Sequence, residues 1–294
     1  MTRWCAVLLA LCVATSLSLG AQTPVFRSGV SMVRVDVLAT DGGRPIEGLT
    51  AADFVLTDNG VPQELTSALG DTDPLDVLFT FDRSASTRGA TLMRLRESAG
   101  ALLDALGSDD QAGLLAFNHM FQLAVKPGPP AAVRRALGEL EPEGSTAIFD
   151  ATSTALTLAA GSSRRTLILL FTDGVDTLSW LPERVVVEAA RSSEAVLYAV
   201  ALPEFVPNGQ PLRGDDAPLR HMAEATGGRL LRANDPTRLR ERFLEVLREM
   251  RSRYVLTFTP TASPQPGWHT LSVTLKTRKG KVAARAGYIG DGTP

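Results

Sequence analysis

The chain is poor in cysteine and histidine, which excludes several kinds of chemistry. Its 294 residues include two cysteines, Cys5 and Cys12, and three histidines, His119, His221 and His269. Both cysteines lie in a leader that we expect to be removed, so the mature chain would have no disulfide, thiol nucleophile or thiolate metal ligand. The histidines are scattered, with no partner at the spacing of a metal site or catalytic triad. We therefore expect them on the surface or in loops.

The chain also lacks an excess of charge and a long apolar stretch after the leader. Its formal net charge is -2, which gives no electrostatic reason to expect nucleic acid or an acidic membrane as partner. No later segment approaches the roughly 20 apolar residues of a transmembrane helix. A Gly-x-Ser-x-Gly elbow, a phosphate-binding loop and a dinucleotide fingerprint are all missing from the sequence.

The first residues have the layout of a secretory signal peptide. A short basic start precedes an apolar stretch over residues 4–13, and small residues follow at positions 18, 20 and 21. The apolar stretch is too short to span a bilayer. Leu11 precedes Cys12 where a lipoprotein signal would have a small residue, so no lipid anchor is expected. We predict that residues 1–21 direct export, which places the mature protein in the periplasm or outside the cell.

The rest of the chain changes its pattern twice, which predicts an α/β domain between two β segments. Residues 22–72 and 254–294 contain short strands separated by turns. Residues 73–253 alternate strands with helices, and several strands are continuous apolar runs. This pattern predicts a doubly wound, mostly parallel sheet covered on both faces. Because neither β segment is long enough to be stable alone, we expect the two flanks to pair into a small β-sandwich-like module.

Residue spacing also predicts the individual elements. In the α/β domain the predicted strands are residues 75–81, 112–117, 121–125, 166–171, 195–202 and 229–231. Helices are expected between them, including one that starts near Thr146. In the C-terminal segment we predict strands over residues 254–259, 271–275 and 282–289.

Oxygen-bearing side chains stand at the ends of two of the buried strands. Asp82, Ser84 and Ser86 directly follow one strand, and Asp173 follows another. Thr146 lies on a connecting loop. In open α/β sheets ligands gather at the carboxyl ends of the strands, so these side chains are expected to converge. Carboxylates and hydroxyls suit Mg²⁺ or another hard divalent ion and do not suit zinc or copper.

Each of these segments also has a simpler explanation. An Asp-x-Ser-x-Ser sequence before a helix can cap that helix, because aspartate and serine accept hydrogen bonds from the first amides. Thr146 can be a helix cap, and the segment around Asp173 can be a plain turn. These alternatives stay open for each segment alone, and the ordered set favours a cation site.

The ordered set resembles the metal-ion-dependent adhesion site of von Willebrand factor type A (VWFA) domains. It consists of Asp82-x-Ser84-x-Ser86, Thr146 in Gly-Ser-Thr and Asp173 in Thr-Asp-Gly. The resemblance covers residues 73–253. It implies that Ser84, Ser86 and Thr146 touch the cation and that Asp82 and Asp173 act mainly through water. A carboxylate from a partner protein would fill the open coordination position. Mg²⁺ is the first candidate, with Mn²⁺ and Ca²⁺ as alternatives.

The flanking segments are similar to an exported bacterial branch known as VWFA-related, which is best represented in Acidobacteria. The similarity is carried by Val35-Asp36-Val37, residues 48–54, Asp58-Asn59-Gly60 and Arg285-Ala286-Gly287-Tyr288.

The predicted function is divalent-cation-dependent binding of another protein. The main alternative is a structural component of an envelope assembly whose metal site does not function. A third hypothesis is a hydrolase in which the metal activates water. No general base such as a nearby histidine is evident for that reaction, so we predict that the protein is not an enzyme.

Overall fold

The structure is a computed structural model, and it describes residues 32–69, 73–173, 176–202, 216–261 and 266–290. The predicted signal peptide lies outside the described residues. Among the described helices, none combines the length and the apolar character needed to cross a membrane.

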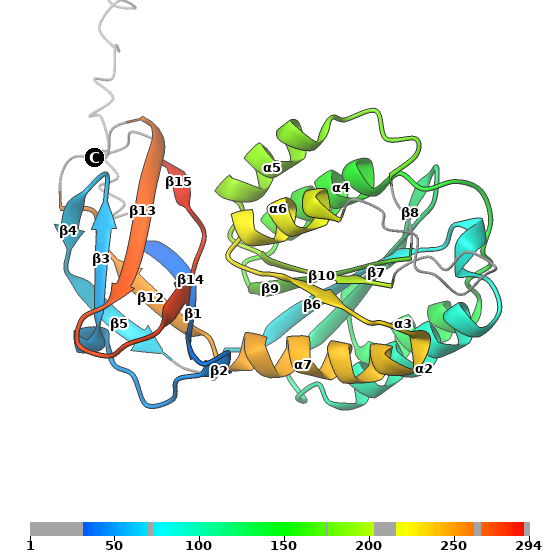
Figure 1. The fold of residues 1–294 in the computed structure, drawn as a ribbon, viewed down its shortest axis with the longest axis horizontal. Coiled ribbons are helices and arrows are strands. Elements are labelled where there is room, and N and C mark those ends of the chain that lie inside the picture. The colour runs from blue at the N-terminus through cyan, green and yellow to red at the C-terminus, as the bar shows by residue number, and fades with distance from the viewer. Residues whose placement is uncertain (1–31, 70–72, 174–175, 203–215, 262–265, 291–294) are drawn as a thin grey trace, which may run out of the picture. The chain divides into compact units, whose positions relative to one another are not determined.

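A six-stranded sheet forms the centre of the α/β domain (Figure 1). In spatial order its strands are β11 (Leu230–Arg232), β10 (Val196–Ala201), β9 (Arg165–Thr172), β6 (Leu75–Asp82), β7 (Gln111–Phe117) and β8 (Phe121–Gly128). Strand β8 is antiparallel to β7, and the other neighbouring pairs are parallel. The prediction of a mostly parallel sheet is therefore confirmed.

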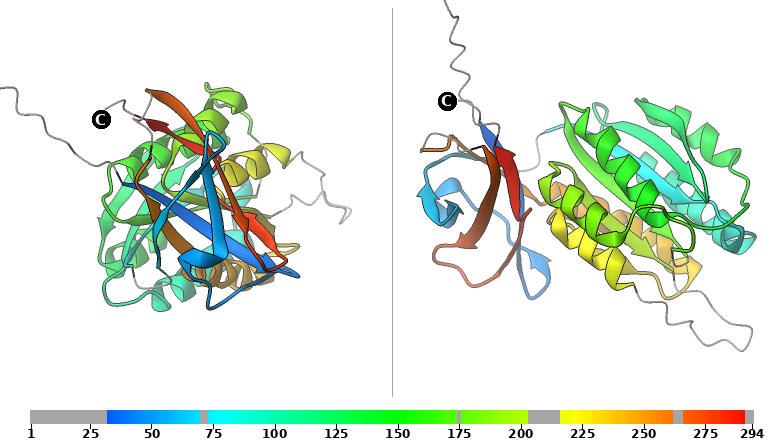
Figure 2. Two further views of the ribbon diagram at one scale, coloured as in Figure 1. Left: turned by 90° about the vertical axis from the view of Figure 1, so that its left-hand side faces the viewer. Right: turned by 90° about the horizontal axis from the view of Figure 1, so that it is seen from above.

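Helices cover both faces of this sheet, as Figures 1 and 2 show. They are α2 (Ala90–Asp104), α3 (Pro130–Gly138), α4 (Ile148–Ala160), α5 (Glu183–Ser192), α6 (Ala217–Ala225) and α7 (Leu239–Arg251). One buried cluster joins the sheet to α2, α3 and α7, and a second joins it to α4, α5 and α6. Successive residues of β6 alternate between the two, since Val77 and Phe79 belong to the first cluster and Leu78 to the second.

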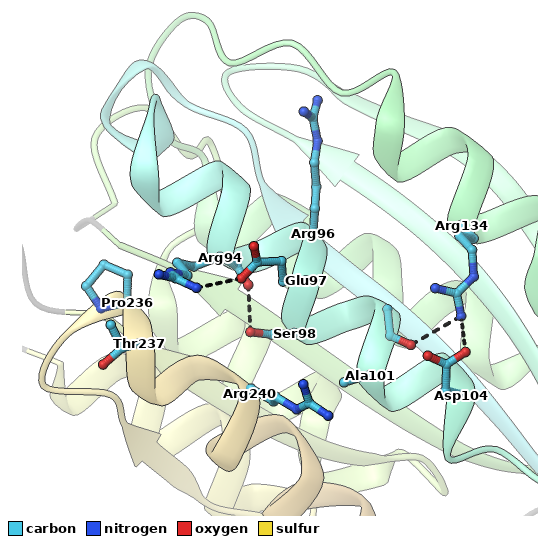
Figure 3. A pocket seen from close by; sticks show the side chains of 11 residues that line it. Arg94, Arg96, Glu97, Ser98, Ala101, Asp104, Arg134, Pro236, Thr237 and Arg240 are labelled. Atoms are coloured by element: carbon cyan, nitrogen blue, oxygen red, sulfur yellow. Dashed lines mark hydrogen bonds and ion pairs between the residues drawn. The ribbon is translucent and has the colours of Figure 1, made fainter.

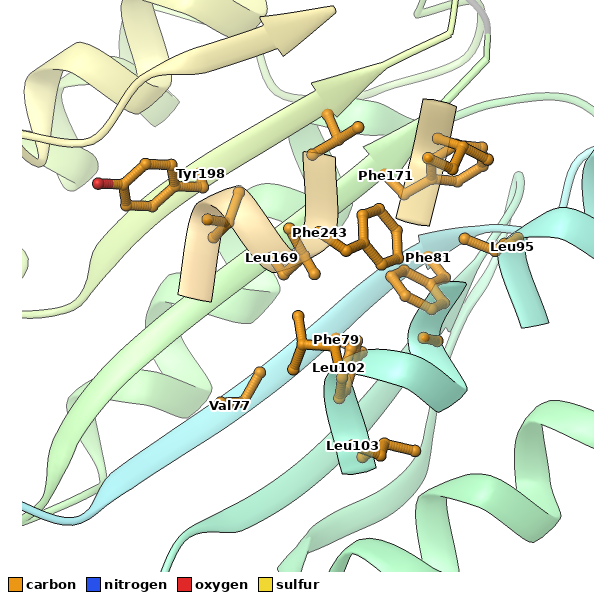
Figure 4. Packing of buried hydrophobic residues seen from close by; sticks show 14 of the residues in the cluster. Val77, Phe79, Phe81, Leu95, Leu102, Leu103, Leu169, Phe171, Tyr198 and Phe243 are labelled. Carbon is orange, nitrogen blue, oxygen red and sulfur yellow. The ribbon is translucent and has the colours of Figure 1, made fainter. Parts of the chain in front are cut away.

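Aromatic side chains fill the first cluster beneath the carboxyl ends of β6 and β9 (Figure 4). The ring of Phe81 lies 6.1 Å from that of Phe171 and 5.8 Å from that of Phe243 on α7, measured between centroids. All three rings are fully buried. Because each tilted or edge-on aromatic pair adds about 0.5–1.5 kcal/mol beyond its buried area, this packing holds the ends of the two strands in place.

The N- and C-terminal flanks pair with one another. Strand β1 (Val33–Asp41) is antiparallel to β12 (Tyr254–Phe258), and β3 (Phe54–Asp58) is antiparallel to β13 (Gly267–Leu275). The shorter strands are β2 (Arg44–Pro45), β4 (Val61–Gln63), β5 (Leu65–Leu69), β14 (Lys281–Ala283) and β15 (Gly287–Gly290). They complete two sheets, β14-β1-β12-β5 with β2 beside β1, and β15-β13-β3-β4.

Both flank sheets contribute to one cluster of buried side chains, which includes Val35, Leu56 and Phe258. The structure therefore shows that the two flanks pair with each other. That they form a β-sandwich-like module stays a prediction. The described residues of the flanks and of the α/β domain fall in the same unit of the chain. Arg165 links them, since its Nε donates to Asp36 Oδ1 at 2.7 Å and its Nη2 donates to Met250 O at 2.9 Å.

The predicted single strand over residues 282–289 is wrong. The segment forms two strands in different sheets, because β14 pairs with β1 and β15 pairs with β13. Between them the side chain of Arg285 is buried, and its Nη2 donates to Arg34 O at 2.6 Å. The sequence of this segment does not reveal where the chain changes its strand partner.

The prediction of exposed histidines holds for His119 and His221 and is wrong for His269. His269 is buried, with its Nδ1 2.9 Å from Asp58 Oδ1 and its ring 4.7 Å from that of Tyr288. The Tyr288 hydroxyl donates to Asp58 Oδ2 at 2.7 Å. Burial and the neighbouring Asp58 carboxylate raise the pKa of Tyr288. His269, Asp58 and Tyr288 thus form a buried hydrogen-bonded cluster in the flank strands.

The close approach of Gly228 to β10 provides a test of the fold. A methyl group added at Gly228 would lie 1.9 Å from the carbonyl oxygen of Leu197, so backbone atoms would have to move. We expect Gly228→Ala to lower the free energy of unfolding by about 1–3 kcal/mol, measured by urea denaturation. Gly138→Ala is the matched control, because nothing lies within 4 Å of an added methyl group there. It should change stability by less than about 1 kcal/mol, and equal losses in both variants would contradict the strand packing.

Candidate metal-binding site

Parallel strands bring both candidate carboxylates to one edge of the central sheet. Asp82 is the last residue of β6, and Asp173 directly follows β9. The two strands are parallel neighbours, with Phe81 opposite Phe171. Asp82 and Asp173 therefore lie at the same carboxyl edge, where ligands bind in open α/β sheets.

The carboxylate of Asp82 is fully buried. Its Oδ1 accepts a hydrogen bond from the amide of Ser84 at 2.8 Å, and its Oδ2 accepts one from the Thr172 hydroxyl at 2.7 Å. Burial raises the pKa of Asp82, and these hydrogen bonds offset part of that effect. In the described part of the chain, none of the ion pairs involves Asp82. The Asp82 carboxyl group is therefore held by neutral donors.

A chain of hydrogen bonds joins the serines to Asp173. The short helix η2 (Ala85–Thr87) places the hydroxyls of Ser84 and Ser86 2.9 Å apart. The Ser86 hydroxyl then donates to Asp173 Oδ1 at 2.8 Å. Ser84 and Asp173 are buried and Ser86 is exposed, so the network reaches the surface at Ser86.

Thr146 lies on the loop that runs beside these serines. The amide of Ala85 donates to Gly144 O at 3.0 Å, and the amide of Glu143 donates to Arg83 O at 2.8 Å. Thr146 is buried, and no hydrogen bond of the described residues joins it to the other four candidates. The structure thus connects Asp82, Ser84, Ser86 and Asp173 directly, and it places Thr146 on the adjoining loop.

Gly144 explains part of the Gly-Ser-Thr pattern. Its φ is +74°, a left-handed conformation that favours glycine. An added methyl group would lie 2.2 Å from His119 Nδ1, so glycine also leaves room for that imidazole. The glycine therefore lets the loop before Thr146 turn close to the end of β7.

The helix predicted to start near Thr146 begins at Ile148, and residues that sequence reasoning missed cap it. The amide of Ile148 donates to Asp176 Oδ1 at 2.7 Å, and the amide of Phe149 donates to Ser179 Oγ at 3.0 Å. In the sequence Asp176 belongs to an Asp-Gly-Val-Asp segment that reads only as a turn, and it is 28 residues from Ile148. Its role as a cap is visible only in three dimensions.

The side chain of Arg83, between Asp82 and Ser84 in the sequence, is held by the loop before Thr146. Its Nη1 donates to Glu141 O and to Glu143 Oε1, both at 3.0 Å. The Glu143 carboxylate therefore offsets the positive charge of Arg83 beside the candidate site.

A separate cavity of about 380 Å³ lies between α2, α3 and the turn at Pro236–Arg238 (Figure 3). It is lined by arginines, two of which are paired: Arg94 with Glu97 and Arg134 with Asp104. None of the five candidate residues lines it. The candidate site and this cavity are therefore distinct.

The chemistry of the candidate site is that of oxygen donors. Among the described residues, no group of three or more histidine, cysteine, aspartate or glutamate side chains could hold a metal ion. A cation here would consequently depend on the hydroxyls of Ser84, Ser86 and Thr146 as well as on the carboxylates. Such a mixture of donors suits a hard divalent ion that keeps some of its water.

The fold and the site define a doubly wound α/β domain with an oxygen-rich edge. The sequence model of the von Willebrand factor type A domain matches residues 76–244. The chain therefore belongs to the von Willebrand factor type A domain family.

One further protein is similar in sequence, and two solved structures agree with this assignment at the level of the fold. The uncharacterized protein sll0103 of Synechocystis sp. is 31% identical over 106 residues, which are 34% of this chain and 25% of that protein. The chain thus matches about a quarter of that relative's length. The von Willebrand factor type A structure from Catenulispora acidiphila has a TM-score of 0.51 and 14% identity, and the match covers 87% of this chain and 73% of the other. A mutant of the PilB minor pilin from Streptococcus sanguinis has a TM-score of 0.50 and 12% identity, with 62% of each chain covered.

The raised pKa of Asp82 predicts how stability depends on pH without metal. The folded protein holds the proton of Asp82 more tightly than the unfolded chain, so the wild type should lose stability as the pH rises above roughly 4 through the raised pKa. The Asp82→Asn variant has no such titration. We expect the stability of the wild type relative to this variant to fall with rising pH, measured by urea denaturation with chelator between pH 4 and 7.5. A difference that stays constant would contradict the burial of an ionisable group at this position.

Proposed function

We propose that the chain binds a divalent cation through Asp82, Ser84, Ser86, Thr146 and Asp173, and that the bound cation takes a carboxylate of a partner protein. The observation that supports this proposal most is the hydrogen-bonded set of Ser84, Ser86 and Asp173 beside the buried Asp82.

The electrostatics of the site favour a cation. Burying an ionised carboxylate is costly unless a positive charge or several hydrogen bonds compensate it. Asp82 receives two hydrogen bonds from neutral groups, and burial raises its pKa in spite of them. A divalent ion near Asp82 and Asp173 would supply the missing positive charge.

The family resemblance implies a division of roles. Ser84, Ser86 and Thr146 would touch the ion, and the two aspartates would act mainly through bound water. Neutral hydroxyl ligands leave much of the ion's charge available, so an incoming carboxylate would be attracted. Mg²⁺ suits this small set of oxygen donors, and Mn²⁺ or Ca²⁺ could replace it.

We also propose a cellular location for this binding. The predicted signal peptide would place this binding domain in the periplasm or outside the cell. Two solved structures with this fold are, by name, a minor pilin and a mussel byssus thread matrix protein. At 12% and 15% identity they share the fold, and the proposal therefore depends on the site. We propose binding without catalysis, and metal-dependent turnover of hydrolase substrates would contradict that part.

A structural role without metal is the second candidate, and one observation favours it. The hydroxyls of Ser84 and Ser86 and the Asp173 carboxylate already satisfy one another through hydrogen bonds of 2.8–2.9 Å. Such a network can rigidify the loops without an ion. Pull-down of partner proteins with and without chelator separates the two functions, since a scaffold would keep its partners in chelator.

Calorimetric titration of Mg²⁺, Mn²⁺ and Ca²⁺ into the protein from Gln22 onward tests the cation site. We expect saturable binding by the wild type and a loss of more than about tenfold in affinity for Asp82→Ala and Asp173→Ala, because each removes charge beside the ion. Asp41→Ala is the control, as it removes an exposed carboxylate from the end of β1. Unchanged affinity in both site variants, with their fold intact, would refute the proposed site.

A further inference from the structure

Large apolar side chains are exposed on two segments that adjoin the loop of Thr146, one after β9 and one at the start of β8. Trp180 is 94% exposed, the highest value for a large hydrophobic residue in the described part of the chain. Leu178, Met120 and Phe121 are 53%, 60% and 54% exposed. We call these four side chains the apolar rim.

Backbone hydrogen bonds tie the loops of the apolar rim to the candidate site. The amide of Leu178 donates to Thr146 O at 3.1 Å. On the other loop the amide of Met120 donates to Asn118 Oδ1 at 2.8 Å, and Asn118 O accepts from the amide of Ala147 at 2.9 Å. Both loops are thus attached to Thr146 or to the residue that follows it.

The backbone of Trp180 is fixed although its side chain is in water. Its amide donates to Asp150 Oδ2 and the amide of Leu181 donates to Asp150 Oδ1, both at 2.9 Å. Asp150 lies in the first turn of α4, whose amides are capped by Asp176 and Ser179. A rigid backbone lowers the entropic cost of binding, and tryptophan is among the residues most enriched in binding hot spots.

Exposure of several large apolar side chains together normally marks an interaction surface. The two surfaces here are chemically different, since the site of Asp82 and Asp173 would carry a cation and the apolar rim carries no charge. Charge complementarity selects a carboxylate for the first, and the hydrophobic effect selects aliphatic or aromatic groups for the second.

We propose that the apolar rim binds bulky apolar side chains that flank the acidic residue of the partner protein. This inference rests on the proposed function, because the carboxylate directed at the cation sets the position of its neighbours. The preferred partner is a protein segment in which aspartate or glutamate stands between aliphatic or aromatic residues. Trp180 and Leu178 determine this preference, and the five candidate metal residues do not.

A peptide experiment tests the inference on the protein from Gln22 onward. A phage library of random peptides is panned in the presence of Mg²⁺ and eluted with chelator. Each enriched acidic peptide is synthesised with its own neighbours and with serine in their place. Trp268→Phe leaves Trp180 as the sole tryptophan of this protein, so its fluorescence reports binding at the rim.

We expect the serine-flanked peptides to bind about tenfold more weakly or worse, and the apolar peptides to shift Trp180 emission to the blue. Trp180→Ser and Leu178→Ser should remove the preference without changing Mg²⁺ affinity. Met93→Ser is the control, because Met93 is 49% exposed on α2 and makes no part of the rim. Circular dichroism and thermal melting check that each variant is folded.

Several outcomes would overturn the inference while the proposed function stands. They are equal binding of apolar-flanked and serine-flanked peptides, or an unchanged preference in Trp180→Ser. Self-association or binding to phospholipid vesicles that is lost in Trp180→Ser would assign the rim to a second copy of the chain or to a membrane. If Mg²⁺ binds calorimetrically and no peptide is released by chelator, both the partner chemistry and the inference fail. Absence of metal binding itself would identify the failure of the proposed function.

Discussion

The buried carboxylate of Asp82 is the constraint on which the candidate site depends. Strand β6 is buried along all eight of its residues, and its parallel partners fix its end. Two hydrogen bonds then hold the carboxylate and orient the turn that follows. Because the Ser84 amide is one of the donors, the position of the Ser84 and Ser86 hydroxyls follows from the position of Asp82. The packing of the sheet thus determines the geometry of a polar site at its edge.

The same loops carry two kinds of chemistry side by side. Thr146 lies on the loop at 144–147 beside the candidate site, and the backbone of this loop anchors the segments that bear Leu178 and Met120. Asp176, on the loop after β9, accepts a hydrogen bond from the amide of Ile148 at the start of α4. Asp150 of α4 accepts hydrogen bonds from the amides of Trp180 and Leu181 on that loop, so the two segments are joined in both directions. In many protein interfaces polar groups fix the orientation of the partner, and apolar groups provide most of the buried contact area.

The parallel core and the approach of Asp82 to Asp173 were predictable, because continuous apolar runs define buried strands and parallel neighbours end at one edge. Features that depend on distant partners were not. Asp176 caps a helix 28 residues away, and nothing in its local sequence distinguishes a cap from a turn. His269 reads as a loop histidine until Asp58, 211 residues away, is placed beside it. The change of sheet near Arg285 likewise depends on two different strand partners.

The pairing of the flanks has a consequence for the order in which the chain can fold. Tyr254 accepts a hydrogen bond from the amide of Leu49, a residue 205 positions earlier, and β1 obtains its neighbour β12 from the same late region. Strands β1 and β3 therefore each keep an unpaired edge until β12 and β13, which follow the α/β domain in the sequence, are available. Contacts of such large sequence separation form slowly, and unpaired edges invite aggregation in the interval. A chaperone that covers these strands would shield them until β12 is available.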